Sequence, residues 1–144
     1  MNAPILAPAA VLVLWSVVML FWMAGTRIPA MGKSGADLKT AKRGGRGVDL
    51  EGVLPDSVNW KGHNYTHLME QPTLFYATIA ILALAGAGDG MNVQLAWGYT
   101  GLRIAHSLWQ SLVNTIPVRF TLFLASSLCL TVLAINAVRV TLGV

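Results

Sequence analysis

Apolar residues gather in four long segments, at residues 4–25, 57–86, 92–114 and 118–142. The first has about twenty-two residues, roughly 33 Å of helix, which is enough to cross a hydrocarbon core of about 30 Å. Because it lacks a basic start and a short apolar stretch, we expect a retained span rather than a cleaved signal peptide. Short turns join the last three segments, so neighbouring helices should pack antiparallel. The pattern predicts an all-α fold: an integral membrane four-helix bundle forming a single domain over residues 1–144.

Residues 26–56 interrupt this pattern with glycine and charge, and predict a loop with one short interfacial turn. Most basic residues lie in or beside this loop: Arg27, Lys33, Lys39, Lys42, Arg43, Arg46 and Lys61. By the positive-inside rule, the loop is cytoplasmic and both termini face the other side of the membrane. With 55% hydrophobic and 11% charged residues, the composition is that of a membrane protein. The net charge of +4 is therefore interpreted through the positions of the basic residues, as evidence for topology, and we predict no nucleic-acid partner.

Polar residues form one stripe on each of two predicted spans. At 100° per residue, an arc of about 100° on the second span collects these residues, confined to its cytoplasmic half: Asn59, His63, Thr66, His67 and Glu70. The third span collects Tyr99, Arg103, His106, Ser107, Gln110 and Asn114. Ionisable groups that face lipid cost several kcal/mol, so both stripes should face protein or a wet cavity, with Arg119 at its cytoplasmic mouth. Asn64 lies off the arc and is expected to meet a neighbouring subunit or the interface.

Several roles stay open for this cavity. The polar residues could have a purely structural role, in which they hold the helices together through interhelical hydrogen bonds. Likewise, Glu70 and Arg103 could neutralise each other as an ion pair. A metal centre could use His63, His67, Glu70 and His106, but Arg103 beside the last histidine would repel a cation. A proton pathway lacks polar residues in the outer halves of the second and fourth spans. An anionic, peptide-like molecule bound by Arg103 and Arg119 accounts for all the polar residues described above. Cys129 lies in an apolar run and needs no functional role.

Three stretches resemble a known family: "HNYTHLMEQPTLFYA" in the second span, "GLRIAHSL" in the third, and "NTIPVR" between the third and fourth. In order and spacing over about residues 57–125, they resemble the membrane-associated proteins in eicosanoid and glutathione metabolism, the MAPEG family, in a short, bacterial-type form. The resemblance implies a homotrimer in the lipid bilayer, with glutathione as co-substrate between adjacent subunits near the cytoplasmic face.

The resemblance also implies roles for single residues. Arg119 matches the arginine that is thought to stabilise the glutathione thiolate in the microsomal transferases, and is the predicted catalytic residue. The predicted glutathione-binding residues are His63, Asn64, His67, Glu70, Arg103, His106 and Gln110. Among these, His63 stands where several members have arginine, His67 where most have asparagine, and Gln110 where some have tyrosine.

The implied activity is that of a microsomal-type glutathione transferase or peroxidase. Its thiolate would attack a hydrophobic electrophile or lipid hydroperoxide that enters from the bilayer. Lowering a thiol pKa from about 8.5 takes roughly 1.4 kcal/mol per unit, within reach of one close cation. Because the family also includes non-catalytic members, the alternative is a membrane protein that binds a lipid or fatty-acid-like anion. A metal-binding helical bundle is the least favoured hypothesis.

Overall fold

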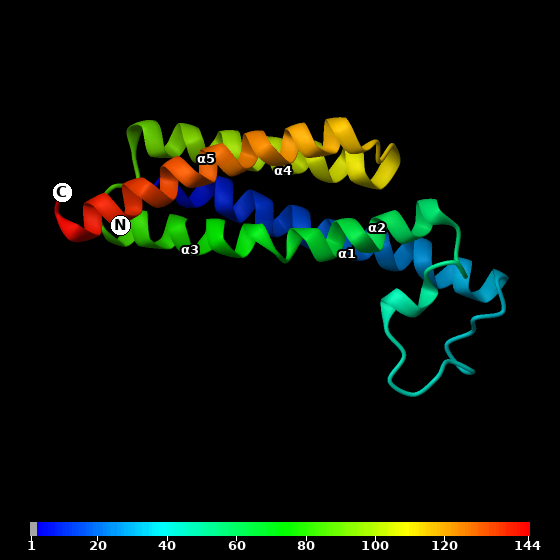
Figure 1. The fold of residues 1–144 in the computed structure, drawn as a ribbon. Helices are drawn as coiled ribbons and strands as arrows, with labels where there is room; N and C mark the ends of the chain where they lie inside the picture. Colours follow the sequence, from blue (N-terminus) through cyan, green and yellow to red (C-terminus); the bar gives the residue numbers. More distant parts are fainter. Residues whose placement is uncertain (1–2) are drawn as a thin grey trace.

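The computed structural model describes residues 3–144, and within this range the chain is helical and contains no strand. The helices are α1 (Leu6–Lys33), α2 (Asp56–Leu68), α3 (Gln71–Leu84), α4 (Gly90–Leu112) and α5 (Ile116–Leu142), with a short 3-10 helix, η1 (Gly47–Leu50). Figure 1 shows α2 and α3 running end to end, so that together they form the second rod of a four-rod bundle. The predicted all-α helical bundle is confirmed.

The predicted second span is broken at Met69 and Glu70, and this differs from the continuous helix expected over residues 57–86. Pro72 causes the break, because proline has no N–H and its ring clashes with the carbonyl four residues earlier, that of Leu68. Glu70 takes a non-helical conformation, with φ −86° and ψ −98°, and its carbonyl accepts a hydrogen bond of 2.7 Å from the Thr73 hydroxyl. The Glu70 side chain therefore projects from a helix junction.

The first helix extends to Lys33, so residues 26–33 are helical where a loop was expected. Polarity after residue 25 marks the point where the chain leaves its apolar stretch. It does not mark the end of the helix, because helical backbone hydrogen bonds are satisfied equally well outside a bilayer. Arg27 is therefore held on a helix, and Met31 in the next turn is buried.

Two helices, α1 and α5, are long and apolar enough to cross a membrane. The third rod, α4, carries a stripe of polar residues that is buried inside the bundle: Tyr99, Thr100, Arg103, His106, Ser107, Gln110 and Ser111. This stripe faces the protein interior, as expected from its chemistry. At the Tyr99 end of the stripe, Phe75 of α3 stacks on the Tyr99 ring with centroids 4.2 Å apart, within an apolar core that also holds Leu12, Ile79 and Leu133.

Candidate functional site

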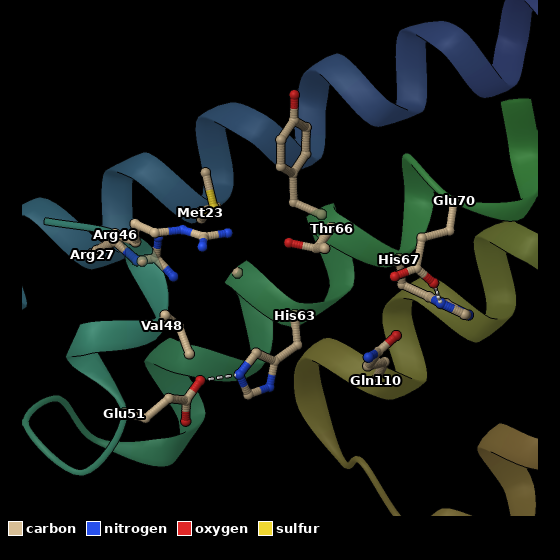
Figure 2. A pocket seen from close by; sticks show the side chains of 13 residues that line it. Met23, Arg27, Arg46, Val48, Glu51, His63, Thr66, His67, Glu70 and Gln110 are labelled. Carbon is tan, nitrogen blue, oxygen red and sulfur yellow. Dashed lines mark hydrogen bonds and ion pairs between the residues drawn. The ribbon is translucent and has the colours of Figure 1, made fainter. Parts of the chain in front are cut away.

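A pocket of about 660 Å³ opens where α1, η1, α2 and the end of α4 meet. Figure 2 shows its wall, which is formed by Met23, Arg27, Arg46, Gly47, Val48, Glu51, Gly62, His63, Tyr65, Thr66, His67, Glu70 and Gln110. Its volume lies within the range of small-molecule sites, and its wall carries both charges. We call it the polar pocket.

Charges of opposite sign occupy different parts of the polar pocket. Arg27 and Arg46 lie on one side, and the Glu70 carboxylate lies on the other (Figure 2). Between them, His63 Nε2 pairs with the Glu51 carboxylate, which joins α2 to the segment just after η1. Gln110 lines the same pocket, and its side-chain oxygen is buried and has no hydrogen-bond partner within residues 3–144. The pocket thus presents two guanidinium groups and two carboxylates, of which that of Glu51 is paired with His63.

A chain of polar contacts leads from Glu70 through His67 to Arg103. His67 Nδ1 lies 3.0 Å from a Glu70 carboxylate oxygen, and His67 Nε2 lies 3.3 Å from Nη1 of Arg103. A guanidinium can only donate, so Nε2 is the acceptor and Nδ1 carries the hydrogen that is donated to Glu70. The expected Glu70–Arg103 pair is therefore indirect, with His67 between them.

Arg103 itself is completely buried, and its second terminal nitrogen donates to the His67 carbonyl at 3.4 Å. It does not line the polar pocket. Its position under His67 indicates that it orients this imidazole rather than touching what occupies the pocket.

A smaller cavity of about 190 Å³ lies on the other side of His67, lined by His67, His106, Ile116, Arg119, Phe120 and Phe123. We call it the aromatic cavity. The His67 and His106 rings are 4.9 Å apart, and both rings contact Phe123. His67 thus forms a wall shared by the polar pocket and the aromatic cavity.

The turn between α4 and α5 sets the direction of Arg119. Its Nη1 donates to the Asn114 side-chain oxygen at 2.7 Å. Asn114 has φ +58°, in the left-handed region, which asparagine adopts more readily than most residues. Because this turn reverses the chain sharply, Arg119 is brought beside the two histidines.

Like Arg103, the predicted site residue Asn64 lines neither cavity. It is buried inside the chain, where its amide donates to the Ser107 hydroxyl at 2.8 Å. The same hydroxyl accepts a hydrogen bond of 3.0 Å from the Trp15 indole. Asn64 therefore lies at the junction of α1, α2 and α4, at a helix interface within the chain.

Comparison with known proteins adds one decisive finding. The model of a family described as the MAPEG family matches residues 5–139, almost the whole chain. The chain belongs to the MAPEG family. No curated protein and no solved structure matches it. Family membership makes it a membrane protein of a group related to glutathione or eicosanoid metabolism.

Three charged residues of this MAPEG protein were missed as site residues: Arg27, Arg46 and Glu51. From the sequence, the two arginines were interpreted only as evidence for topology. Nothing in the hydrophobic pattern indicates that the Arg27 side chain, on α1, packs against α2. The one available signal was Gly62, a glycine inside a predicted helix, where a packing reason is usual.

The metal hypothesis required His63, His67, Glu70 and His106 to gather around one point. Within residues 3–144, no three His, Cys, Asp or Glu side chains are arranged to hold a metal ion. His63 instead pairs with Glu51, and His67 bonds to Glu70 on one side and approaches Arg103 on the other. The polar groups of this MAPEG protein are thus used in a different arrangement.

Proposed function

We propose that the protein is a glutathione-dependent membrane transferase or peroxidase that acts on hydrophobic electrophiles or lipid hydroperoxides. The observation that carries this proposal is the charge pattern of the polar pocket, with two guanidinium groups opposite the Glu70 carboxylate, while the other carboxylate, Glu51, is paired with His63. Glutathione is a tripeptide with two carboxylates and one ammonium group. A wall of this kind complements both signs of charge.

The contacts that we assign follow from this complementarity. Arg27 and Arg46 hold the carboxylates of the tripeptide, replacing the arginine that other members carry at the position of His63. Glu70 accepts from its ammonium group, and the buried Gln110 oxygen accepts from a peptide N–H. His67, oriented by Arg103, lines both cavities, so the peptide lies in the polar pocket while its cysteine side chain passes the imidazole to reach Arg119.

The reaction then takes place beside Arg119. The thiol loses its proton to solvent, and the Arg119 guanidinium stabilises the thiolate that remains. With an aryl halide, the sulfur forms a bond to carbon and the halide leaves with the bonding electrons. With a lipid hydroperoxide, the sulfur attacks the terminal oxygen and the O–O bond breaks, which gives glutathione sulfenic acid and a lipid alkoxide that takes up a proton to become the alcohol. The thiol of a second glutathione then attacks the sulfenic sulfur, and glutathione disulfide and water are released. Phe120 and Phe123 provide an apolar wall for either substrate.

We further propose four spans, a cytoplasmic loop between α1 and α2, and a homotrimer. The basic residues of the loop support this orientation. The polar pocket and the aromatic cavity lie at the same end of the bundle as the loop, which supports delivery of glutathione from the cytoplasm. Native mass spectrometry in mild detergent tests the assembly, and a monomer there would contradict a site shared between subunits.

Glutathione binding to the detergent-solubilised protein tests the proposed function. We expect millimolar glutathione to raise the unfolding temperature, because a ligand that binds the folded state stabilises it. Arg119→Ala should keep this shift but lose conjugation to an activated aryl chloride, whereas Arg139→Ala, at the far end of α5, should keep both. Absence of any shift in the unaltered protein contradicts the proposal, and full activity in Arg119→Ala refutes the thiolate role.

A second function, the non-catalytic binding of a lipid or fatty-acid-like anion, is favoured by a different feature. An apolar groove of about 680 Å³ runs between α3 and α5 and ends beside Arg139. Such a groove suits an acyl chain with its charged head at the arginine. Native mass spectrometry that detects a retained lipid, released by Arg139→Ala, would support this function, provided that glutathione gives no stabilisation.

A further inference from the structure

The Arg27 side chain lies in contact with two glycines from other elements. A Cβ atom on Gly62 of α2 would overlap the Nη2 atom of Arg27 and lie 3.1 Å from its Cζ. A Cβ atom on Gly47 of η1 would lie 3.0 Å from Nη1. The guanidinium therefore fits between α2 and η1 in space that any other residue at these positions would fill.

We propose that Gly62 is a positioning residue, whose missing side chain seats the Arg27 guanidinium in the polar pocket and so determines its affinity for a carboxylate ligand. The inference rests on the proposed function for its ligand, glutathione. It goes beyond that function by assigning a role to a residue that has no side chain to contact the ligand.

The identity of residue 62 supports the inference. Gly62 is buried inside α2, and glycine in a helix interior is less stable than alanine there. The surrounding backbone of α2 is helical, so no unusual dihedral angle requires glycine at this position. Close approach of another group is the remaining physical reason, and the group that approaches is Arg27.

The bonding of Arg27 shows how the guanidinium is held. Within residues 3–144, Arg27 forms no ion pair, and its buried Nε has no hydrogen-bond partner. Shape, provided by Gly62 and Gly47, holds it in place. Because no carboxylate in the described part of the chain pairs with it, its charge remains available to an anionic ligand.

The overlap at Gly62 also predicts what alanine would move. The Arg27 atoms concerned form the far end of a flexible side chain, so the side chain gives way before the backbone does. We therefore expect Gly62→Ala to fold and to expel the Arg27 guanidinium from its seat. The loss should be one of binding, with the helix itself retained.

Two measurements on the full chain in detergent test this inference. The first is labelling of arginine by phenylglyoxal, followed by mass spectrometry of the Arg27 peptide, with exposed Arg43 as internal reference. Gly62→Ala should increase Arg27 labelling several-fold. The second is the glutathione dissociation constant, which should rise about tenfold, as expected for loss of one charged hydrogen bond. Arg27→Gln should cause the same loss, and combining it with Gly62→Ala should cause no further loss.

The control is Gly25→Ala, which lies on α1 close to Arg27 and would place its Cβ in open space. It should leave both labelling and affinity unchanged. Equal labelling in Gly62→Ala and Gly25→Ala, or additive losses in the double variant, would overturn the inference. If the unaltered protein does not bind glutathione, the proposed function fails, whereas the labelling result still decides whether Gly62 seats Arg27.

Discussion

The two halves of the second rod differ in how they are held. The buried positions of α2 include Asn59, Gly62 and Asn64, which are polar or lack a side chain. Those of α3 include Phe75, Ile79 and Leu82, which are apolar. Thus α2 is held by directed hydrogen bonds and close approach, whereas α3 is held by packing. One predicted span therefore contains a half that forms the site and a half that anchors it.

The break between the halves makes this division possible. Glu70 stands at the junction, so its carboxylate reaches His67 while α3 continues as an apolar helix. In a membrane, helix association depends on van der Waals packing and on interhelical hydrogen bonds. The two halves of this rod each use mainly one of these forces, which allows substitutions to separate their contributions.

The largest effect is expected in the apolar half. Phe75 is fully buried against Tyr99, so Phe75→Ala should lower the free energy of unfolding by about 3–5 kcal/mol through lost contacts and a cavity. Unfolding in detergent, followed by circular dichroism, measures this. Leu74→Ala is the matched control. The Leu74 side chain is next to Phe75 in the sequence but is 63% exposed, so its removal should cost little stability. Equal losses in the two variants would show that packing does not hold α3.

The next effect concerns the polar contacts beneath α2. Arg103→Met keeps an apolar stem of similar length but leaves the His67 ring nitrogen and carbonyl without their donor. We expect a loss of about 2 kcal/mol in stability, together with weaker glutathione binding as His67 turns. Arg139→Met, in the last turn of α5, should leave both unchanged. Unaltered binding in Arg103→Met would contradict the positioning of His67 by Arg103.

A smaller effect on stability, with a clear effect on binding, is expected at the junction. Pro72→Ala removes the clash that breaks the rod, so α2 can continue into α3 and turn Glu70 away from His67. The glutathione dissociation constant should rise about tenfold, since one charged hydrogen bond is misplaced. Pro117→Ala serves as control, because Pro117 also lies at the start of a helix, α5, but does not interrupt a rod of the bundle. Unchanged affinity in Pro72→Ala would mean that the junction does not position Glu70.

The smallest effect is expected where the loop meets α2. The Glu51 and His63 side chains are 44% and 46% exposed, and exposed ion pairs contribute little. Glu51→Gln should therefore change the free energy of unfolding by less than about 0.5 kcal/mol. Thermal unfolding at two salt concentrations measures it. A loss comparable to that of Arg103→Met would show that the segment after η1 is structurally required.

Residues in the helical pattern were the most predictable part of the site. His63, His67, Glu70 and Gln110 were found from the spacing of polar residues within apolar spans, and they line the polar pocket. This succeeds because a polar group in a span has few places to go except the bundle interior. The break at Glu70 could also be predicted from the sequence, since Pro72 is a local cause of helix breaking. Arg27 and Arg46 could not, because a charged residue outside a span is compatible with many positions.

The sequence by itself determined the all-α bundle, the two polar stripes and the MAPEG resemblance, since all depend on local periodicity and short motifs. Only the tertiary structure decided which charges share a cavity. Arg27 and Gly62 are far apart in the chain, and their contact follows from the way α1 packs beside α2. The placement of His67 between Glu70 and Arg103 depends in the same way on three helix segments meeting. Such contacts arise from the packing of helices against one another, and local patterns in the sequence are not enough to predict them.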